Sequence, residues 1–230
     1  DIGAGTSDLM INEYSVGYAD KISLKPKPLF WESFKLAGDD LLKEIIQQVI
    51  IEGPVLSEND QNCSGVIENY AKENGIENIS EKLNGFFGEN TNNFGMIARN
   101  MRKNFIHQVG MPIALYYLKE ANNTNENISL KFEEIIGKKF QNKELIEYFQ
   151  NHFDFNFLDI QWNINSNKIA TIVKNVFDGL VKQISIVLNQ YECDYIVLSG
   201  KPCSLNSLSS LFLKYLSCSP SNVVNLNDFW

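Results

Sequence analysis

The first eight residues are Asp1-Ile2-Gly3-Ala4-Gly5-Thr6-Ser7-Asp8, two glycines around one small residue with two hydroxyl side chains and an acid at each end. Glycine lacks Cβ, so the backbone of such a turn approaches a ligand closely and can present several N–H groups to one anionic oxygen. Asp1 and Asp8 are candidate Mg²⁺ ligands, because Mg²⁺ takes one or two carboxylates together with phosphate and water oxygens. The pattern favours a phosphate-binding turn, and a glycine-rich β-turn without a ligand is the alternative.

The residues after this turn predict strands. Apolar and polar side chains alternate over residues 9–16, as they do in a half-buried strand. Pro26 and Pro28 exclude a central strand locally, because proline cannot donate to a sheet ladder. An extended apolar pattern resumes over residues 28–34. We therefore expect a β-meander over residues 9–34.

A helix is predicted over residues 39–51. The acidic pair Asp39 and Asp40 precedes apolar residues at helical spacing, namely Leu41, Leu42, Ile45, Ile46, Val49 and Ile50. Either aspartate suits a helix cap, and an acid is stabilised at the positive end of the helix dipole. Free N–H groups at that end are able to face a phosphate or a ribose. Capping alone explains the same residues.

The last third of the chain predicts a crossover unit. A helix over residues 166–189 is followed by an apolar strand over 194–199, a turn at Gly200, a helix over 205–216 and a strand beginning at Val223. Strand, helix and strand in this order form a right-handed crossover in a parallel sheet. Ligands of such sheets bind at the carboxyl ends of the strands, which places a candidate site near Gly200.

The middle of the chain carries weaker patterns. Residues 95–121 predict a long helix with a basic face, interrupted near Pro112. Residues 153–164 alternate aromatic and polar side chains, which predicts a strand or hairpin with the aromatic side chains buried. The acids and the histidine nearby, His152, Asp154 and Asp159, show no recognised metal-ligand spacing.

Composition excludes several classes of protein. The chain has 230 residues, 44% of them hydrophobic, which indicates a globular fold. Its formal net charge of −8 argues against a nucleic-acid or acidic-membrane surface. No apolar run is long enough for a membrane span. The four cysteines lack C-x-x-C spacing, so we expect reduced thiols in a cytoplasmic protein; they are Cys63, Cys193, Cys203 and Cys218.

The opening turn resembles the second phosphate motif of the superfamily of actin, DnaK-type chaperones and sugar kinases, Asp-(Ile/Leu)-Gly-Gly-Gly-Thr-(Ser/Thr)-Asp, with Ala4 in place of the middle glycine. The segment around Gly38 and Asp39 is similar to the element that opens the next helix in actin-like ATPases. The resemblance implies bound ATP and Mg²⁺. It implies that Asp1 assists the metal and the attacking water, and that Asp8 also serves the metal. Phosphate contacts would come from Gly3, Ala4, Gly5 and Thr6, with Gly38 and Asp39 on the ribose–phosphate side.

Two further segments resemble adenosine-binding elements of the same superfamily. Gly200 matches the first glycine of the Gly-Gly-x-(Ser/Thr) motif, and Lys201 replaces the second. Arg102 matches the basic residue of a Glu-x-x-(Lys/Arg) helix motif whose glutamate this chain lacks. The Ser-Gly-Lys-Pro-Cys run at residues 199–203, followed by a helix, also resembles the bacterial SrfB family of virulence factors, which carries actin-like ATPase signatures.

These resemblances imply an α/β fold: an actin-like ATPase (ribonuclease H-like) lobe with a mixed sheet flanked by helices. Residues 1–54 and 166–230 would form the nucleotide-facing subdomain, and residues 55–165 an inserted α+β outer subdomain. The chain begins inside the motif, so we expect a fragment whose first phosphate motif lies in an upstream lobe of the same protein. A Mg²⁺-dependent ATPase would need that lobe, and the isolated fragment would hydrolyse ATP poorly or not at all.

Two alternatives remain open. A scaffold that keeps a degenerate actin-like fold would assemble with itself or with bacterial protein partners without nucleotide. Lys201 and the missing glutamate favour that interpretation, whereas the intact Asp1–Thr6 turn opposes it. A sugar or acetate kinase shares the turn, but the sequence offers no recognisable acceptor-substrate motif.

Overall fold

The computed structural model describes residues 1–18, 22–51, 65–88, 95–123, 128–137 and 140–229. The chain is mixed α/β and divides into two compact units, which are residues 1–41 with 171–230 (unit 1) and residues 42–170 (unit 2). The boundary predicted at residues 54/55 lies outside the described residues. Within the described residues, no helix combines the length and the apolar character that a bilayer span requires.

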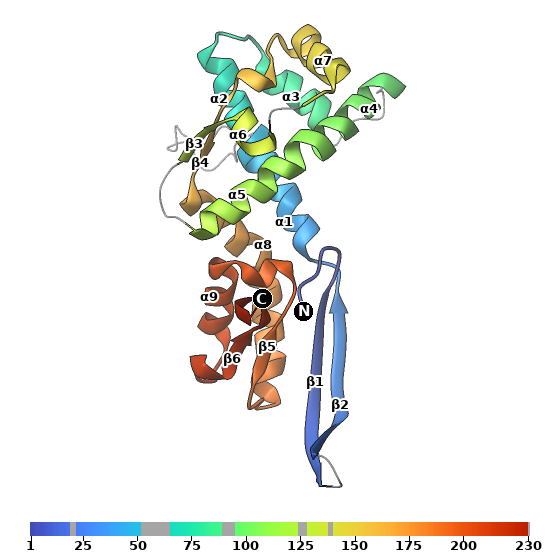
Figure 1. Cartoon of the computed structure of the whole chain (residues 1–230), viewed down its shortest axis with the longest axis vertical. Coiled ribbons are helices and arrows are strands. Elements are labelled where there is room, and N and C mark those ends of the chain that lie inside the picture. The colour runs from blue at the N-terminus through green and yellow to red at the C-terminus, as the bar shows by residue number, and fades with distance from the viewer. Residues whose placement is uncertain (19–21, 52–64, 89–94, 124–127, 138–139, 230) are drawn as a thin grey trace. The chain divides into compact units, whose positions relative to one another are not determined.

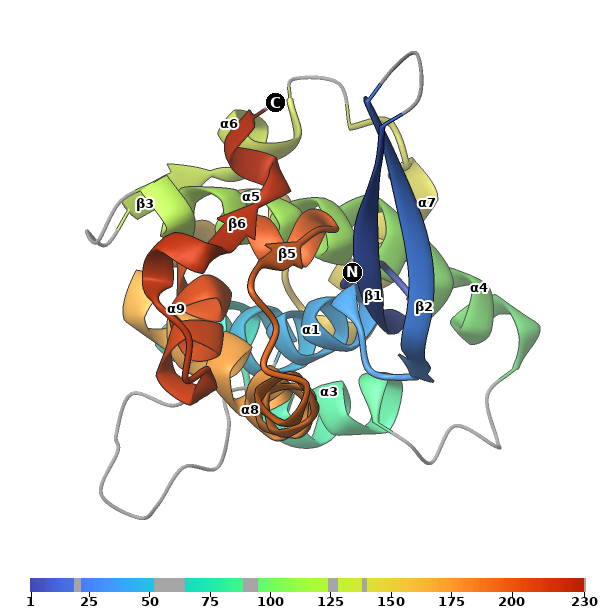
Figure 2. The same ribbon diagram turned by 90° about the horizontal axis from the view of Figure 1, so that it is seen from below.

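Unit 1 begins with a long β-hairpin. Strand β1 (Ser7–Tyr18) pairs antiparallel with β2 (Ile22–Phe34), as Figures 1 and 2 show. The predicted meander is therefore wrong in its strand count, because Pro26 and Pro28 lie inside one continuous strand. Both strands of a two-stranded sheet are edge strands, and an edge strand tolerates residues without an N–H group.

The rest of unit 1 confirms the predicted strand–turn–helix–strand order. Strand β5 (Ile196–Leu198) leads through the short helix η4 (Lys201–Ser204) and helix α9 (Asn206–Tyr215) to strand β6 (Val223–Asn225). β5 and β6 are parallel. Two 3-10 turns flank β6, η5 (Pro220–Asn222) and η6 (Leu226–Phe229).

Two helices cross the division between the units. Helix α1 (Gly38–Ile45) continues into a π-helical turn η1 (Ile46–Ile51), and helix α8 (Ser166–Gln190) matches the prediction closely. The described strands form three separate two-stranded sheets and no larger mixed sheet, which corrects the predicted sheet. One physical reason lies in β2, where two prolines remove donors that a further strand would need.

Unit 2 is mainly helical (Figure 1). Its remaining elements are α2 (Val66–Glu73), α3 (Ile79–Phe87), α4 (Met96–Phe105), η2 (Ile106–Gly110), α5 (Met111–Asn123), β3 (Ile128–Lys131), α6 (Phe132–Ile136), α7 (Lys143–Phe153), η3 (Phe157–Asp159) and β4 (Gln161–Ile164). β3 and β4 are antiparallel. The interruption predicted near Pro112 is the π-helical η2, and a π-helical turn accommodates a residue that cannot complete the i to i−4 ladder.

An aromatic cluster forms the core of unit 2. Five of the six apolar side chains predicted to be buried in this stretch are buried, namely Phe153, Phe155, Phe157, Ile160 and Trp162. The sixth, Ile164, lies outside the described side chains. Only Gln161–Ile164 is a strand, however, because α7 extends to Phe153 and Asp154 then turns the chain with a positive φ of 63°. The prediction of burial is therefore confirmed for the described side chains, whereas the predicted extended conformation is confirmed only in β4.

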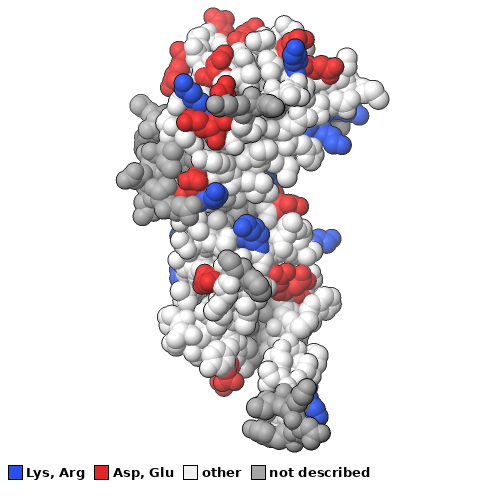
Figure 3. Space-filling view, viewed as in Figure 1, with Lys and Arg blue, Asp and Glu red and all other residues white. Residues whose placement is uncertain are grey.

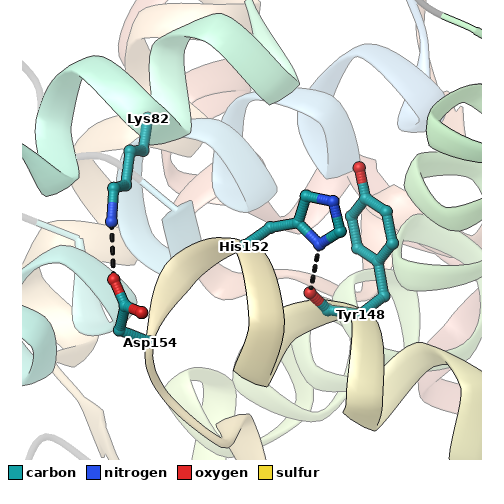
Figure 4. Close-up of polar contacts among 4 residues, drawn as sticks. All are labelled: Lys82, Tyr148, His152 and Asp154. Atoms are coloured by element: carbon teal, nitrogen blue, oxygen red, sulfur yellow. Dashed lines mark hydrogen bonds and ion pairs between the residues drawn. The ribbon is translucent and has the colours of Figure 1, made fainter.

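The polar residues near this cluster make structural contacts. His152 Nδ1 lies 2.9 Å from the Tyr148 carbonyl oxygen, and Asp154 forms an ion pair with Lys82 at 2.7 Å, as Figure 4 shows. Among the described residues, no group of three His, Cys, Asp or Glu side chains is arranged to hold a metal ion.

Candidate functional site

The opening turn is the end of a small antiparallel hairpin with two distinct faces. Asp1 and Asp8 exchange two backbone hydrogen bonds, of 2.8 and 2.7 Å, and Gly3 N donates to Thr6 O at 2.9 Å. Directly opposed residues of this kind carry their side chains on the same face. Ile2 and Ser7, on the other face, are buried. The turn therefore has one face in the core of unit 1, and the two carboxylates share the other face.

The start of helix α1 packs against this turn. Gly38 N donates to Gly3 O at 3.0 Å, and Asp39 N donates to Ala4 O at 2.8 Å. A Cβ on Gly38 would lie 3.1 Å from Gly3 O, so a side chain there would crowd the turn. The structure thus brings these two predicted motifs together. The amide groups of Gly38 and Asp39 are already hydrogen-bonded to the turn.

This docking orients the peptide groups of the turn. The described peptide bonds are trans, and a trans peptide points its N–H opposite to its C=O. Because the carbonyls of Gly3 and Ala4 face α1, the N–H groups of Ala4 and Gly5 point away from it. These two N–H groups and that of Thr6 donate to no described acceptor, and all three residues are exposed. Successive free N–H groups of this kind bind anions.

The third predicted motif packs beneath the same turn. Ile2 N donates to Ser199 O at 2.9 Å, and Gly200 follows with a φ of 92°. A Cβ on Gly200 would lie only 2.0 Å from the Ile2 carbonyl oxygen. Gly200 is therefore required by packing against the turn. Lys201 is exposed at the start of η4.

The two carboxylates of the exposed face are only partly satisfied. Asp1 Oδ1 accepts a hydrogen bond from Ser199 Oγ at 2.8 Å, and Asp8 Oδ2 accepts one from Thr6 Oγ1 at 3.2 Å. The second oxygen of each carboxylate has no described donor. Like charges on directly opposed residues repel each other, and a divalent cation would relieve that repulsion. The pair therefore fits Mg²⁺ held by two carboxylates together with phosphate and water oxygens.

Sequence reasoning missed two residues that support the turn. Ser199 fixes the Asp1 carboxylate, and its only signal was its place directly after the strand that precedes Gly200. Asn227 donates through Nδ2 to Gly200 O at 3.1 Å, and nothing in its local sequence indicated this contact.

Arg102 belongs to unit 2, on α4. Its guanidinium donates to the carbonyl oxygens of Phe87 at 2.8 Å and Gly88 at 3.2 Å, at the end of α3. A basic side chain on the last carbonyls of a helix satisfies groups that have no partner within the helix. Arg102 therefore has a structural role in unit 2, and its contact with adenosine stays a prediction.

The described cysteines are free thiols, in agreement with the sequence analysis: Cys193, Cys203 and Cys218. Cys63 lies outside the described residues. Cys203 is buried in η4, and this burial raises the pKa of its thiol. A protonated, buried thiol serves packing and is a poor nucleophile.

Comparison with known proteins places the chain in one family. The family model described as virulence factor SrfB matches residues 1–230, which is the whole chain. No curated protein and no solved structure matches. The family match agrees with the resemblance of residues 199–203, the segment that packs beneath the turn. The chain belongs to the SrfB family of virulence factors.

Proposed function

We propose that this chain is the nucleotide-binding lobe of an actin-like ATPase and that the turn at Gly3–Thr6 holds the phosphates of Mg²⁺-ATP. One observation carries the proposal. The N–H groups of Ala4 and Gly5 point away from α1 and have no described acceptor. Two consecutive oriented N–H groups on a glycine turn form the concave anion site that phosphate oxygens occupy.

Each residue of the turn has a separate task in this proposal. The N–H groups of Ala4, Gly5 and Thr6 donate to phosphate oxygens, and Asp1 and Asp8 hold the cation. Mg²⁺, when bound, neutralises charge on the phosphates. The Ser199 hydroxyl fixes one oxygen of Asp1, so the other oxygen would face the cation and would reach the attacking water through the cation's water shell.

The remaining predicted residues act around this turn. Gly38 and Asp39 orient its peptide groups through α1, and Gly200 allows β5 to end directly beneath it. Lys201 supplies an exposed cation beside the nucleotide. Hydrolysis also requires the upstream lobe, so this chain alone binds ATP and turns it over slowly or not at all.

A thermal shift with Mg²⁺-ATP, Mg²⁺-ADP and Mg²⁺-GTP tests the proposal. A ligand at 100 times its Kd stabilises the folded state by about 2.7 kcal/mol, which raises the midpoint by several degrees. We expect this shift for the adenine nucleotides. We expect Gly5→Val to abolish it, because no described atom lies within 4 Å of a Cβ at Gly5 and the new side chain enters the space left for phosphate.

Gly95→Val is the matched control. Gly95 also has open space around its Cβ, and its φ of −61° and ψ of 162° suit valine. The control should keep the full nucleotide shift. Equal shifts in both variants would place the nucleotide elsewhere, and no shift in the unmodified chain at millimolar Mg²⁺-ATP would contradict binding by this lobe.

One observation favours the second candidate, a scaffold without nucleotide. The backbone conformation of Gly200 and its packing against Asp1 and Ile2 explain the glycine there without a ligand. Lys201 stands where a second glycine would allow close approach to adenine. If the chain is a scaffold, its assembly measured by light scattering should be the same with and without Mg²⁺-ATP. Assembly that occurs only with the nucleotide, or that the nucleotide reverses, would rule the scaffold out.

A further inference from the structure

Beyond Asp8 at its base, the β1–β2 hairpin carries an exposed face without charged side chains among its described residues. Alternation along each strand and the pairing register place eight residues on this apolar face: Met10, Asn12, Tyr14 and Val16 of β1, and Leu24, Pro26, Pro28 and Trp31 of β2. The exposed fractions of its large side chains are 60% for Met10, 59% for Tyr14, 47% for Val16, 64% for Leu24 and 65% for Trp31. In Figure 3 the hairpin is white directly above its grey tip, with acidic side chains (red) at the level of its base and basic ones (blue) beside the tip.

The opposite face of the hairpin is packed at its base. Next to the Gly3–Thr6 turn, Leu9 and Ile11 are buried, and the Phe30 ring lies 5.9 Å from the Tyr191 ring. Further out, Glu13 and Lys27 form an ion pair at 2.9 Å. The charged side chains of the outer half thus lie on this face and not on the apolar face. A sheet face that stays in water is normally polar, so the apolar face does not have the composition of a solvated face.

The outer half of the hairpin has no packing partner among the described residues. Every described side chain of residues 13–16 and 23–28 is exposed, so no described residue covers either face there. A two-stranded hairpin is marginally stable in water unless an apolar face is packed. An exposed contiguous apolar patch marks an interaction surface.

We propose that the apolar face is a homodimer interface, on which the hairpins of two copies of this chain stack face to face. The five large side chains present on the order of 600 Å², since an aromatic side chain alone contributes ~150–250 Å². Two copies would bury about 1,200 Å², the lower limit for a specific interface. The eight residues of the apolar face carry no charge, so this face offers no electrostatic recognition to a different partner. A second copy of the chain presents the same uncharged face, and a two-fold axis then forms every contact twice.

Sedimentation velocity of the 230-residue chain, at chain concentrations from about 1 to 500 µM, tests the proposal. We expect a reversible monomer–dimer equilibrium that strengthens with added salt, because each copy carries a net charge of −8 and salt screens the repulsion. Trp31→Thr should weaken the dimer by about 10-fold or more, since it removes a large buried side chain from each copy. Lys25→Thr, on the opposite face of the same strand, should change the Kd by less than about twofold.

Acrylamide quenching identifies the interface without relying on a variant of Trp31. In a Trp230→Phe background, Trp31 is the accessible tryptophan, because Trp162 is buried. Its quenching should fall as the dimer forms. A chain that stays monomeric throughout the range would overturn the proposal, as would a dimer that leaves Trp31 quenching unchanged or that survives Trp31→Thr.

Discussion

Gly200→Ala should lower the free energy of unfolding of unit 1 by about 3 kcal/mol or more. The backbone at Gly200, with φ 92° and ψ 156°, lies in a region that is essentially reserved for glycine. An added Cβ would lie 2.0 Å from the Ile2 carbonyl oxygen and 2.6 Å from its carbon, both of which are backbone atoms and cannot swing aside. Hydrogen exchange read by mass spectrometry should show faster exchange in peptides of unit 1.

Gly179→Ala is the control for this prediction. Gly179 lies within α8 and no described atom is within 4 Å of its Cβ position, so the same substitution should stabilise the chain by about 0.5–1 kcal/mol. The same glycine-to-alanine substitution is therefore expected to lower the free energy of unfolding at position 200 and to raise it at position 179. A Gly200→Ala chain whose unit 1 peptides exchange as slowly as those of the unmodified chain would show that β5 does not end against the turn.

Phe149→Ala should destabilise unit 2 by about 3–5 kcal/mol. Phe149 is fully buried on α7 and lies at the centre of the aromatic cluster. Its ring centroid lies within 6.5 Å of the rings of Phe86, Phe87, Phe105, Tyr148, Phe153, Phe155 and Phe157. Truncation removes the burial of the ring and these pairings, and the surrounding side chains cannot all collapse into one cavity. Urea unfolding followed by near-ultraviolet circular dichroism measures the loss.

Phe140→Ala measures the same truncation at the edge of the cluster. Phe140 is half-buried, and its ring contacts those of Phe132 and Phe157. We expect a loss of about half that of Phe149→Ala or less, since less area leaves the core. If the two variants lost equal stability, Phe149 would not be the centre of the cluster.

The sequence predicted those parts of the fold that depend on local pattern. The 25-residue helix α8 and the β5–α9–β6 crossover follow from helical periodicity and from a short apolar run bounded by glycine. Burial of Phe153, Phe155 and Phe157 followed from their alternation. Their conformation did not, because a 3-10 turn and a residue with positive φ place aromatic side chains inward as effectively as a strand does.

Contacts between distant segments lay beyond local pattern. The three motifs were predicted from residues 1–8, 38–40 and 199–203, but no spacing shows that Gly38 and Asp39 give their N–H groups to the turn. That contact decides which way the Ala4 and Gly5 amides point. The uninterrupted β2 strand was missed for a related reason. A proline excludes a central strand, and only the pairing shows that β2 has no second neighbour among the described strands.

The most direct measurement is a ¹⁵N–¹H correlation spectrum of the chain titrated with Mg²⁺-ATP. An amide that gains a charged phosphate acceptor forms a stronger, shorter hydrogen bond, so its proton resonance moves downfield. We predict the largest downfield shifts at Ala4, Gly5 and Thr6, with smaller changes at Gly38 and Asp39, whose amides stay bonded to the turn. A titration that saturates while the Ala4 and Gly5 resonances stay in place would contradict the assignment of this turn as the phosphate site.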